Sequence, residues 1–290
     1  MLLLRSLATT ATAPAASICP VAGSGWCTSC NRVHNIHRTP AAEAAAFTLL
    51  ESIDAAGSFD LDSTDPAARF TTTAMMKPGK MLGVLTTREG PVLKAYSGML
   101  GVPSTWHCPG WAGPVAEMNL EDSKEASRRF QAIVRHVQQA ANSDGADAQA
   151  AARKVHKQLS LELAADLAAS VRLRNWRGQA FTLPELLERD TAAATSGSTA
   201  QLPGGVGDCA APKLLMEAFG RGLEPTGLAE VWYVPPHRRT AKLTSSASGK
   251  TGGARTQLAH GSFHPACRER CGPIMGFLLC GLPRCPPAPG

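Results

Sequence analysis

The sequence predicts an α+β fold in which short strand pairs accompany a central, long helical segment. Apolar residues recur at helical spacing over 122–172, whereas short apolar runs around glycine-containing turns, at 80–98 and 227–234, are typical of strands. Hydrophobic residues make up 44% of the 290 residues, which excludes wholesale disorder and allows one large or two small cores. No apolar run reaches the roughly 18 residues that a membrane-spanning helix needs, so we expect no membrane partner.

Residues 1–25 form a leader rich in Ala, Ser and Thr, in which Arg5 is the only charged side chain. The leucine run ends at Arg5 and is too short for the apolar segment of a secretory signal. The composition is typical of a transit peptide and predicts localisation in a chloroplast or mitochondrion; the alternative is a disordered, Ala-rich leader without a targeting role. Because both compartments are reducing, we expect the 9 cysteines to be thiols or metal ligands rather than disulfides.

The region 26–190 is predicted to contain both helices and strands. Thr39 followed by Pro40 is typical of a helix start, and the turn at 88–90 joins two expected strands. Apolar residues at every fourth position from Val155 to Val171 are expected to form a packing surface. The expected elements are a ligand-rich loop at 26–37, a helix at 40–55, two strands within 80–98 and helices at 122–141 and 146–172.

Residues 208–282 are predicted to form a second α+β unit, which contains cysteines and is interrupted by a basic linker. Segments rich in Ser, Thr, Gly and Pro mark the linkers, and the helix and strand follow from capping and apolar patterns. The expected segments are a linker at 191–207, a helix at 209–221 capped by Asp208, a strand at 227–234, a basic linker at 235–260 and a tail at 283–290.

The formal net charge of +6 is concentrated in two basic tracts. Lysines and arginines exceed acids by five over 128–177 and by seven over 235–290, whereas 43–70 is acidic. Basic tracts attract polyanions and aromatic rings stack on unpaired bases, so RNA is the partner that these tracts predict; the alternative is a set of solvated basic faces. The candidate RNA-binding residues are Arg172, Arg174, Trp176, Arg177, Arg238 and Arg239.

Three sequence blocks stand out between residues 80 and 282. They are KMLGVLTTREGPVLKAYSGMLG leading into WHCPGWAGPV at 80–115, GDCAAPKLLMEAFGRGLEPTGLAEVWYV at 207–234 and HGSFHPACRERCGPIMGFLLCGL at 260–282. Together they resemble the amino-terminal extension domain of a subset of bacterial RluA-like RNA pseudouridine synthases. The resemblance covers about residues 80–282 and, more loosely, 27–55, and the paired-cysteine and Gly-Asp-Cys blocks are its most specific part.

In that family the extension precedes a catalytic domain, whose Arg-Leu-Asp motif supplies the aspartate that attacks the target uridine. This chain contains no Arg-Leu-Asp tripeptide. The resemblance therefore implies an accessory, RNA-associated domain that is inactive alone and works with a catalytic subunit on a separate chain, or a truncated gene product of such a synthase. No residue of the chain is predicted to isomerise uridine.

Cys27 and Cys30 are the first candidate zinc ligands. Their Cys-x-x-Cys spacing lets two thiolates share one tetrahedral ion, and His34 and His37 follow closely. Because zinc fingers use longer spacings, we do not expect these four residues alone to complete the site. The alternatives are a redox pair or a mobile loop.

Cys209, Cys267 and Cys271 are the second set of candidate zinc ligands. Cys267 and Cys271 lie one helical turn apart, and Cys209 starts a predicted helix, where free amide hydrogens favour a thiolate. With His260 or His264 nearby, the three predict a zinc or reactive-thiol site and, as an alternative function, a zinc- or thiol-dependent enzyme. Otherwise they are small buried hydrophobes.

One carboxylate lies near this set in the sequence. Glu230 belongs to the expected strand at 227–234, where alternation more simply predicts that it points to solvent; the alternative is a buried acid between apolar neighbours. In zinc-dependent nucleobase deaminases, a glutamate two residues after the first ligand moves the protons. The corresponding residue here is Ala211, so deaminase activity is not expected.

Overall fold

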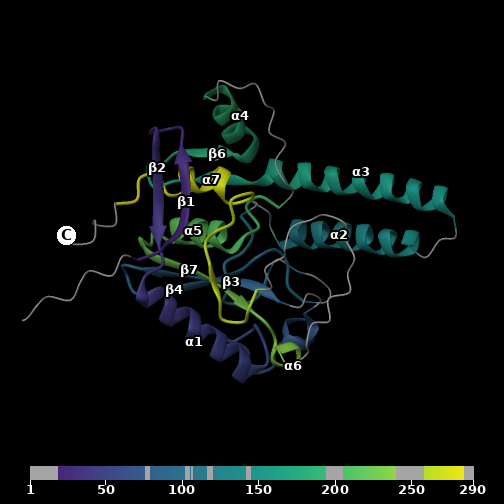
Figure 1. Ribbon diagram of the computed structural model, residues 1–290, viewed down its shortest axis with the longest axis horizontal. Helices are drawn as coiled ribbons and strands as arrows, with labels where there is room; N and C mark the ends of the chain where they lie inside the picture. The colour runs from purple at the N-terminus through teal and green to yellow at the C-terminus, as the bar shows by residue number, and fades with distance from the viewer. Residues whose placement is uncertain are drawn as a thin grey trace, which may run out of the picture.

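The computed structural model shows the α+β fold that the sequence predicts, with helices and antiparallel strands alternating along the chain (Figure 1). The leader up to residue 18, most of the 191–207 linker, residues 240–257 of the basic linker and the tail from 284 lie outside the part that it describes. The described residues are 19–75, 79–101, 105, 107–115, 120–141, 145–193, 205–239 and 258–283.

A four-stranded antiparallel sheet with the strand order β4-β3-β7-β8 forms the centre of the molecule. The predicted hairpin at 80–98 is confirmed, since β3 and β4 pair across their turn. β3 also pairs with β7, so strands from the expected region 26–190 and from the expected unit 208–282 belong to one sheet. A hairpin of two strands is only marginally stable by itself, and the pairing with β7 supplies a further strand. The strands are β3 (Lys80–Thr87), β4 (Val92–Tyr96), β7 (Pro225–Tyr233) and β8 (Phe263–His264).

Helices cover both faces of this sheet. α1 (Pro40–Ala56) packs on one face and α5 (Ala210–Gly220) on the other (Figure 1). Successive side chains of β3 point to opposite faces: Leu82 and Val84 join the core under α1, whereas Gly83 lies against α5. Both faces of the central strands are therefore buried.

The two helices that cover the sheet begin in different ways. Thr39 caps α1, as predicted, because its hydroxyl oxygen accepts the N–H of Ala42 at 3.3 Å. The prediction that Asp208 caps α5 is wrong, because the cap position belongs to Cys209. The carbonyl of Asp208 instead accepts the N–H of Gly98 at 2.7 Å, which ties the start of α5 to the end of β4.

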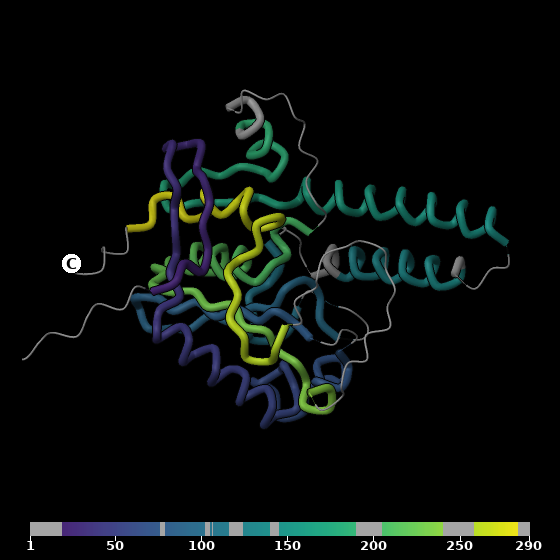
Figure 2. Tube along the Cα trace, viewed as in Figure 1, coloured from purple at the N-terminus to yellow at the C-terminus, as the bar shows by residue number. Residues whose placement is uncertain are grey.

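A second layer lies beyond α5, where an amino-terminal hairpin packs against a carboxyl-terminal helix. The hairpin consists of β1 (Val21–Cys27) and β2 (Arg32–His37), and the helix is α7 (Gly272–Leu278). Figure 2 shows the purple hairpin beside the yellow helix. Gly25 and Gly276 let the two backbones touch, since a Cβ on either residue would overlap the backbone of the other element.

This hairpin changes two expectations. Residues 26–37 do not form a loop, because the chain pairs from Cys27↔Arg32 outward. β1 begins at Val21, so the last residues of the segment 1–25 belong to the folded chain.

The helices α2 (Leu120–Ala141) and α3 (Ala146–Ser170) pack against each other and project from the body (Figure 1). Leu163 on α3 is buried as predicted, whereas Val155 and Leu159 are exposed. Residues four apart drift around a helix by about 40° per step, so this apolar stripe leaves the contact face toward its amino-terminal end. Among the described helices, α2 and α3 included, none is long and apolar enough to cross a membrane.

A short hairpin follows α3 and packs beside α7. The turn between its strands contacts the segment after α7, where the N–H of Trp176 donates to the carbonyl of Cys280 at 3.0 Å. Its strands are β5 (Arg172–Arg174) and β6 (Ala180–Thr182), and the remaining helices are α4 (Leu183–Ala193) and α6 (Pro236–Arg239).

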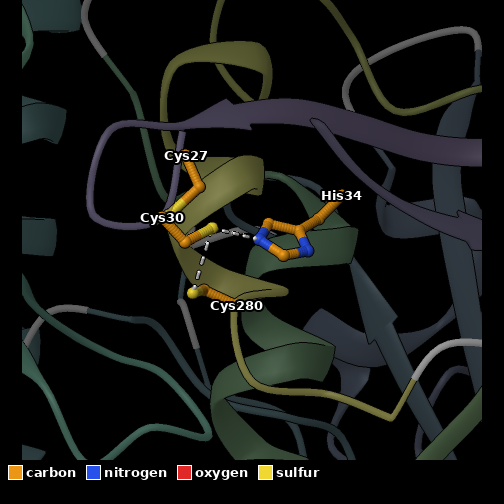
Figure 3. A group of neighbouring side chains, drawn as sticks. All are labelled: Cys27, Cys30, His34 and Cys280. Atoms are coloured by element: carbon orange, nitrogen blue, oxygen red, sulfur yellow. Dashed lines mark hydrogen bonds between the residues drawn. The ribbon is translucent and has the colours of Figure 1, made fainter. Parts of the chain in front are cut away.

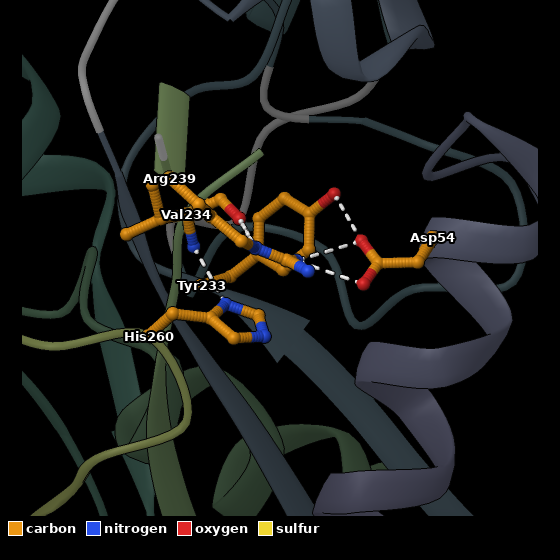
Figure 4. Close-up of polar contacts among 5 residues, drawn as sticks. All are labelled: Asp54, Tyr233, Val234, Arg239 and His260. Atoms are coloured by element: carbon orange, nitrogen blue, oxygen red, sulfur yellow. Dashed lines mark hydrogen bonds and ion pairs between the residues drawn. The ribbon is translucent and has the colours of Figure 1, made fainter. Parts of the chain in front are cut away.

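A polar network anchors the start of the basic linker to α1 (Figure 4). Arg239 pairs with the carboxylate of Asp54 at 2.8 Å, and the hydroxyl of Tyr233 donates to the same carboxylate at 3.0 Å. The N–H of Val234 donates to Nδ1 of His260 at 3.1 Å, which joins the two ends of the linker. The first residues of the basic linker therefore belong to the folded body.

Candidate metal centres

Four metal-binding side chains meet where the β1–β2 hairpin contacts α7 (Figure 3). They are Cys27 at the end of β1, Cys30 in the turn, His34 on β2 and Cys280 after α7, and their donor atoms all lie within 4.8 Å of one another. Sγ of Cys30 is 3.8 Å from Sγ of Cys280 and 3.0 Å from Nε2 of His34. Zinc–sulfur bonds of about 2.3 Å place the sulfurs of a tetrahedral site about 3.8 Å apart. This Cys3His group is therefore a candidate four-coordinate zinc site.

Local backbone geometry brings these donors together. Asn31 adopts a positive φ of 51°, which a tight turn between two strands needs and which asparagine tolerates. The turn places His34 opposite Gly25, and Gly25 touches Gly276 of α7. The chain leaves α7 one turn after this contact and delivers Cys280 to the hairpin.

The structure brings together the predicted ligands Cys27 and Cys30, but a distant cysteine rather than His37 completes the group. His37 pairs with Val21 at the end of the hairpin away from the turn, so a strand separates it from the thiols. Cys280 was not predicted as a ligand, because it lies 250 residues from Cys30 and has no partner at a recognisable spacing.

The surroundings of Cys280 disfavour its thiolate form and raise the pKa of its thiol. Burial, together with the neighbouring thiols of Cys27 and Cys30, raises the pKa of Cys280 to about 12. A divalent cation removes this penalty because it supplies the positive charge that three clustered thiolates need. The group is therefore a candidate metal site, in which a bound cation would favour the thiolate form of Cys280.

Cys209, Cys267 and Cys271 form a second group, the thiol triad. Cys209 caps α5, and the other two lie in the turn that leads into α7, where the N–H of Cys271 donates to the carbonyl of Cys267 at 3.2 Å. Sγ of Cys267 is 3.7 Å from Sγ of Cys209 and 3.6 Å from Sγ of Cys271. These separations match the tetrahedral edge of about 3.8 Å as closely as the first group does.

The hydrogen bonds within the triad shift the pKa values of its thiols in opposite directions. Hydrogen bonds from Cys209 and then from Cys271 lower the pKa of Cys267 far below its usual range. The hydrogen bond to Cys267 is the main cause that raises the pKa of Cys209 to about 12, and hydrogen bonds to the other two thiols raise the pKa of Cys271. Cys267 is exposed and Cys271 is buried, so the triad reaches from the surface into the core.

A buried carboxylate lies beside the triad. Glu230, which is 3% exposed, pairs with Gly83 on the face of the sheet that α5 covers, and its Oε1 accepts the N–H of Ala211 at 3.0 Å. Burial raises the pKa of Glu230 to about 7, against the Ala211 hydrogen bond, and the charge on Cys267 raises it further. The prediction that Glu230 points to solvent is wrong, because α5 occupies the space that alternation assigns to water.

The two histidines expected near the triad bond elsewhere. Nε2 of His264 lies 2.8 Å from the hydroxyl of Ser262, and Nδ1 of His260 accepts the N–H of Val234. Neither belongs to the thiol triad, which contains no donor besides the three thiols among the residues that the structure describes.

Comparisons with known proteins come to one result. No protein-family model, no curated protein and no solved structure matches this chain. The resemblance to the synthase extension therefore stays a prediction, and function has to be argued from the geometry.

Of the four predicted RNA-binding residues on β5 and in the turn that follows it, three are exposed and one is half-buried. Arg172, Arg174 and Arg177 are exposed. Trp176 is half-buried and packs edge-on against Phe219, with ring centroids 5.7 Å apart. The three arginines are therefore on the surface, whereas Trp176 packs partly into the fold.

The two predicted RNA-binding arginines of the basic linker make contacts within the fold. Arg238 donates to the carbonyl of Met75 at 2.9 Å, and Arg239 pairs with Asp54. RNA binding by any of the six residues stays a prediction, but these two guanidinium groups already have protein partners.

Proposed function

We propose that the protein is a zinc protein with two separate centres, the Cys3His group and the thiol triad. The observation that supports this best is the separation of 3.6 to 3.8 Å between sulfur atoms, seen for two pairs in the triad and for Cys30 and Cys280 in the Cys3His group, which matches the edge of a tetrahedral zinc site. Thiolates and imidazole nitrogens are also the ligands that zinc prefers.

The Cys3His group is the structural centre in this proposal. It offers four protein donors, which fill a tetrahedral coordination sphere and leave no position for a substrate. Structural zinc sites contribute about 10 kcal/mol or more of apparent binding free energy to folding. A zinc ion here clamps the first hairpin of the fold to the segment after α7.

Metal content tests the proposal directly. The protein is expressed with ample zinc and purified without chelators, and zinc per chain is measured by elemental analysis and native mass spectrometry. We expect about two equivalents in the wild type and about one each in Cys280→Ser and Cys271→Ser, since each variant loses one ligand set. Cys108→Ser is the matched control, because Cys108 is a buried free thiol outside both groups.

Two results contradict the proposal. One is a wild-type protein that contains no zinc and takes up none when the reduced, apo chain is exposed to it. The other is a loss of zinc in Cys108→Ser as large as that in Cys280→Ser, since the loss then reflects unfolding rather than removal of a ligand.

We also propose that the zinc protein acts as an accessory, RNA-associated factor in a chloroplast or mitochondrion and serves a catalytic subunit on a separate chain. The exposure of Arg172, Arg174 and Arg177 on one short hairpin favours this role, together with the net charge of +6. The uridine chemistry then belongs to the other subunit.

Binding to a structured RNA, measured against salt concentration, tests the RNA-associated role. We expect Arg172→Ala/Arg174→Ala to weaken binding and to reduce the slope of log affinity against log salt by about 2. Arg88→Ala/Arg221→Ala removes the same charge from exposed arginines elsewhere and should leave the slope nearly unchanged. Binding that does not vary with salt, or an equal effect of both double variants, would argue against the role.

A further inference from the structure

The two metal groups differ in the number of donors they offer. The Cys3His group has four, whereas the thiol triad has three within the described part of the chain. His264, the closest histidine in sequence, bonds to Ser262 instead. Zinc sites with three protein ligands keep a fourth position for water or substrate, which distinguishes catalytic from structural sites. Because Cys267 is exposed, this fourth position is open to solvent.

The environment of the triad supplies a second element of a reactive centre. Glu230 is buried, and its Oε1 accepts the N–H of Ala211, which lies two residues after Cys209 at the start of α5. Its position depends on two features: Gly83 opposite it lets α5 approach the sheet, and the Ala211 N–H holds one carboxylate oxygen. This hydrogen bond uses only one of the two carboxylate oxygens.

The fold therefore supplies by tertiary contact what the sequence lacks locally. Ala211 follows Cys209 by two residues and has no side chain that can move a proton. The carboxylate that bonds to its N–H comes from β7, 19 residues further along the chain. A cation bound by the triad would favour the ionised form of this buried carboxylate.

We infer that the thiol triad holds an open zinc centre, in which water takes the fourth position and the Glu230 carboxylate accepts the proton of that water. This inference rests on the proposed zinc at the triad. The ligand class is a small oxygen or nitrogen donor at rest and, during turnover, an electrophile with a carbonyl or amidine carbon. The exposed Arg268 and Arg270, between Cys267 and Cys271, favour an anionic substrate.

The hydrolytic step balances without an oxidant or reductant. The water gives one proton to Glu230, and the hydroxide forms a C–O bond to the substrate carbon while the π electron pair moves to the heteroatom. When the tetrahedral adduct collapses, the bond to the leaving group breaks, and the leaving group takes the proton that Glu230 held. Glu230 is then ionised again.

Cobalt substitution tests the open position without a known substrate. Zinc is replaced by Co²⁺ in the full chain, cobalt per chain is measured, and azide is added while the visible absorption is recorded. We expect about two equivalents of cobalt and a saturable, azide-dependent spectral change. Cys271→Ser, which keeps the Cys3His group, should bind about one equivalent and show no change with azide.

The outcomes separate this inference from the proposed function. Two bound equivalents with a spectrum that azide does not alter mean that the triad is closed, which overturns the inference and leaves the proposed zinc protein intact. A wild type that binds no more cobalt than Cys271→Ser overturns the metal at the triad itself. A spectral change that persists in Cys271→Ser places the open position at the other centre and overturns the inference.

Hydrolysis of 4-nitrophenyl acetate by the zinc form tests Glu230. We expect Glu230→Gln to keep both metals and the azide response of the cobalt form but to hydrolyse the ester about 100-fold more slowly. Glu217→Gln is the matched control, because Glu217 is an exposed carboxylate on α5, and it should hydrolyse at the wild-type rate. A wild type no faster than Cys271→Ser, or a fully metallated Glu230→Gln that is as fast as the wild type, overturns the assignment.

Discussion

Lys213 permits a sharp test of how the fold holds the triad, because it buries a charge one helical turn after Cys209. The side chain is 1% exposed, and its Nζ donates to the carbonyls of Tyr96 at 3.0 Å and Gly98 at 2.9 Å. Both carbonyls lie where β4 ends, so Lys213 fixes the first half of α5 against the sheet. The position of Cys209 depends on that contact.

The size of the effect follows from the pKa of Lys213. Burial lowers it from 10.5 to about 8, against the opposing influence of Asp208 and Cys209. The unfolded chain therefore binds more protons between these two values, so the free energy of unfolding rises as the pH increases through this window. A shift of about 2.5 pKa units corresponds to a change of about 3 kcal/mol in the free energy of unfolding. This gain in stability is absent below the folded-state pKa of about 8 and complete above the unfolded-state pKa of 10.5.

The assay compares wild type with Lys213→Met, which removes the charge at similar volume. Urea unfolding of both zinc-loaded proteins from about pH 7.5 to about pH 9.5 should show the stability difference, wild type minus variant, growing by about 2 kcal/mol. Loss of the two hydrogen bonds changes the variant equally at every pH, so it does not affect this growth. Parallel curves would refute the reasoning. We also expect Lys213→Met to weaken zinc binding at the triad and not at the Cys3His group.

Three further perturbations test other parts of the fold. Gly276→Ala should lower the free energy of unfolding by about 1–3 kcal/mol in urea, because its Cβ overlaps the hairpin backbone; Gly272→Ala, whose Cβ meets nothing, is the control, and equal losses would contradict the close contact. Trp111→Phe removes the hydrogen bond from Nε1 to the carbonyl of Phe59 at 2.6 Å and should cost about 1–3 kcal/mol by the same assay. A strong chelator should lower the melting temperature of the wild type far more than that of Cys280→Ser, and equal shifts would speak against a structural metal there.

Local patterns predicted those parts of the fold that local interactions determine. Thr39 and Pro40 mark the start of α1 because the cap and the first turn involve only neighbours in sequence. The turn near Gly90 predicts the β3–β4 hairpin for the same reason, since a two-strand register follows from its turn. The pairing of β3 with β7 could not be predicted this way, because some 140 residues separate the partners.

The candidate sites divide along the same line. The spacing of Cys27 and Cys30 predicts a metal site, but Cys280 is recognised as a candidate ligand only from the packing of α7 against the hairpin. The prediction that Glu230 points to solvent was wrong because the alternation rule assumes that one face of the sheet is exposed to water. The nearly continuous apolar run from Gly227 to Val234 is the signal that could have corrected this, since such runs are typical of strands buried on both faces.

The long separation between Cys30 and Cys280 has a consequence for biosynthesis. At roughly 5–20 residues per second, a ribosome needs about 10–50 s to add the residues between them. In the proposed zinc protein, Cys27, Cys30 and His34 are therefore made long before Cys280. The Cys3His site can close only after α7 and Cys280 have been synthesised and docked on the hairpin.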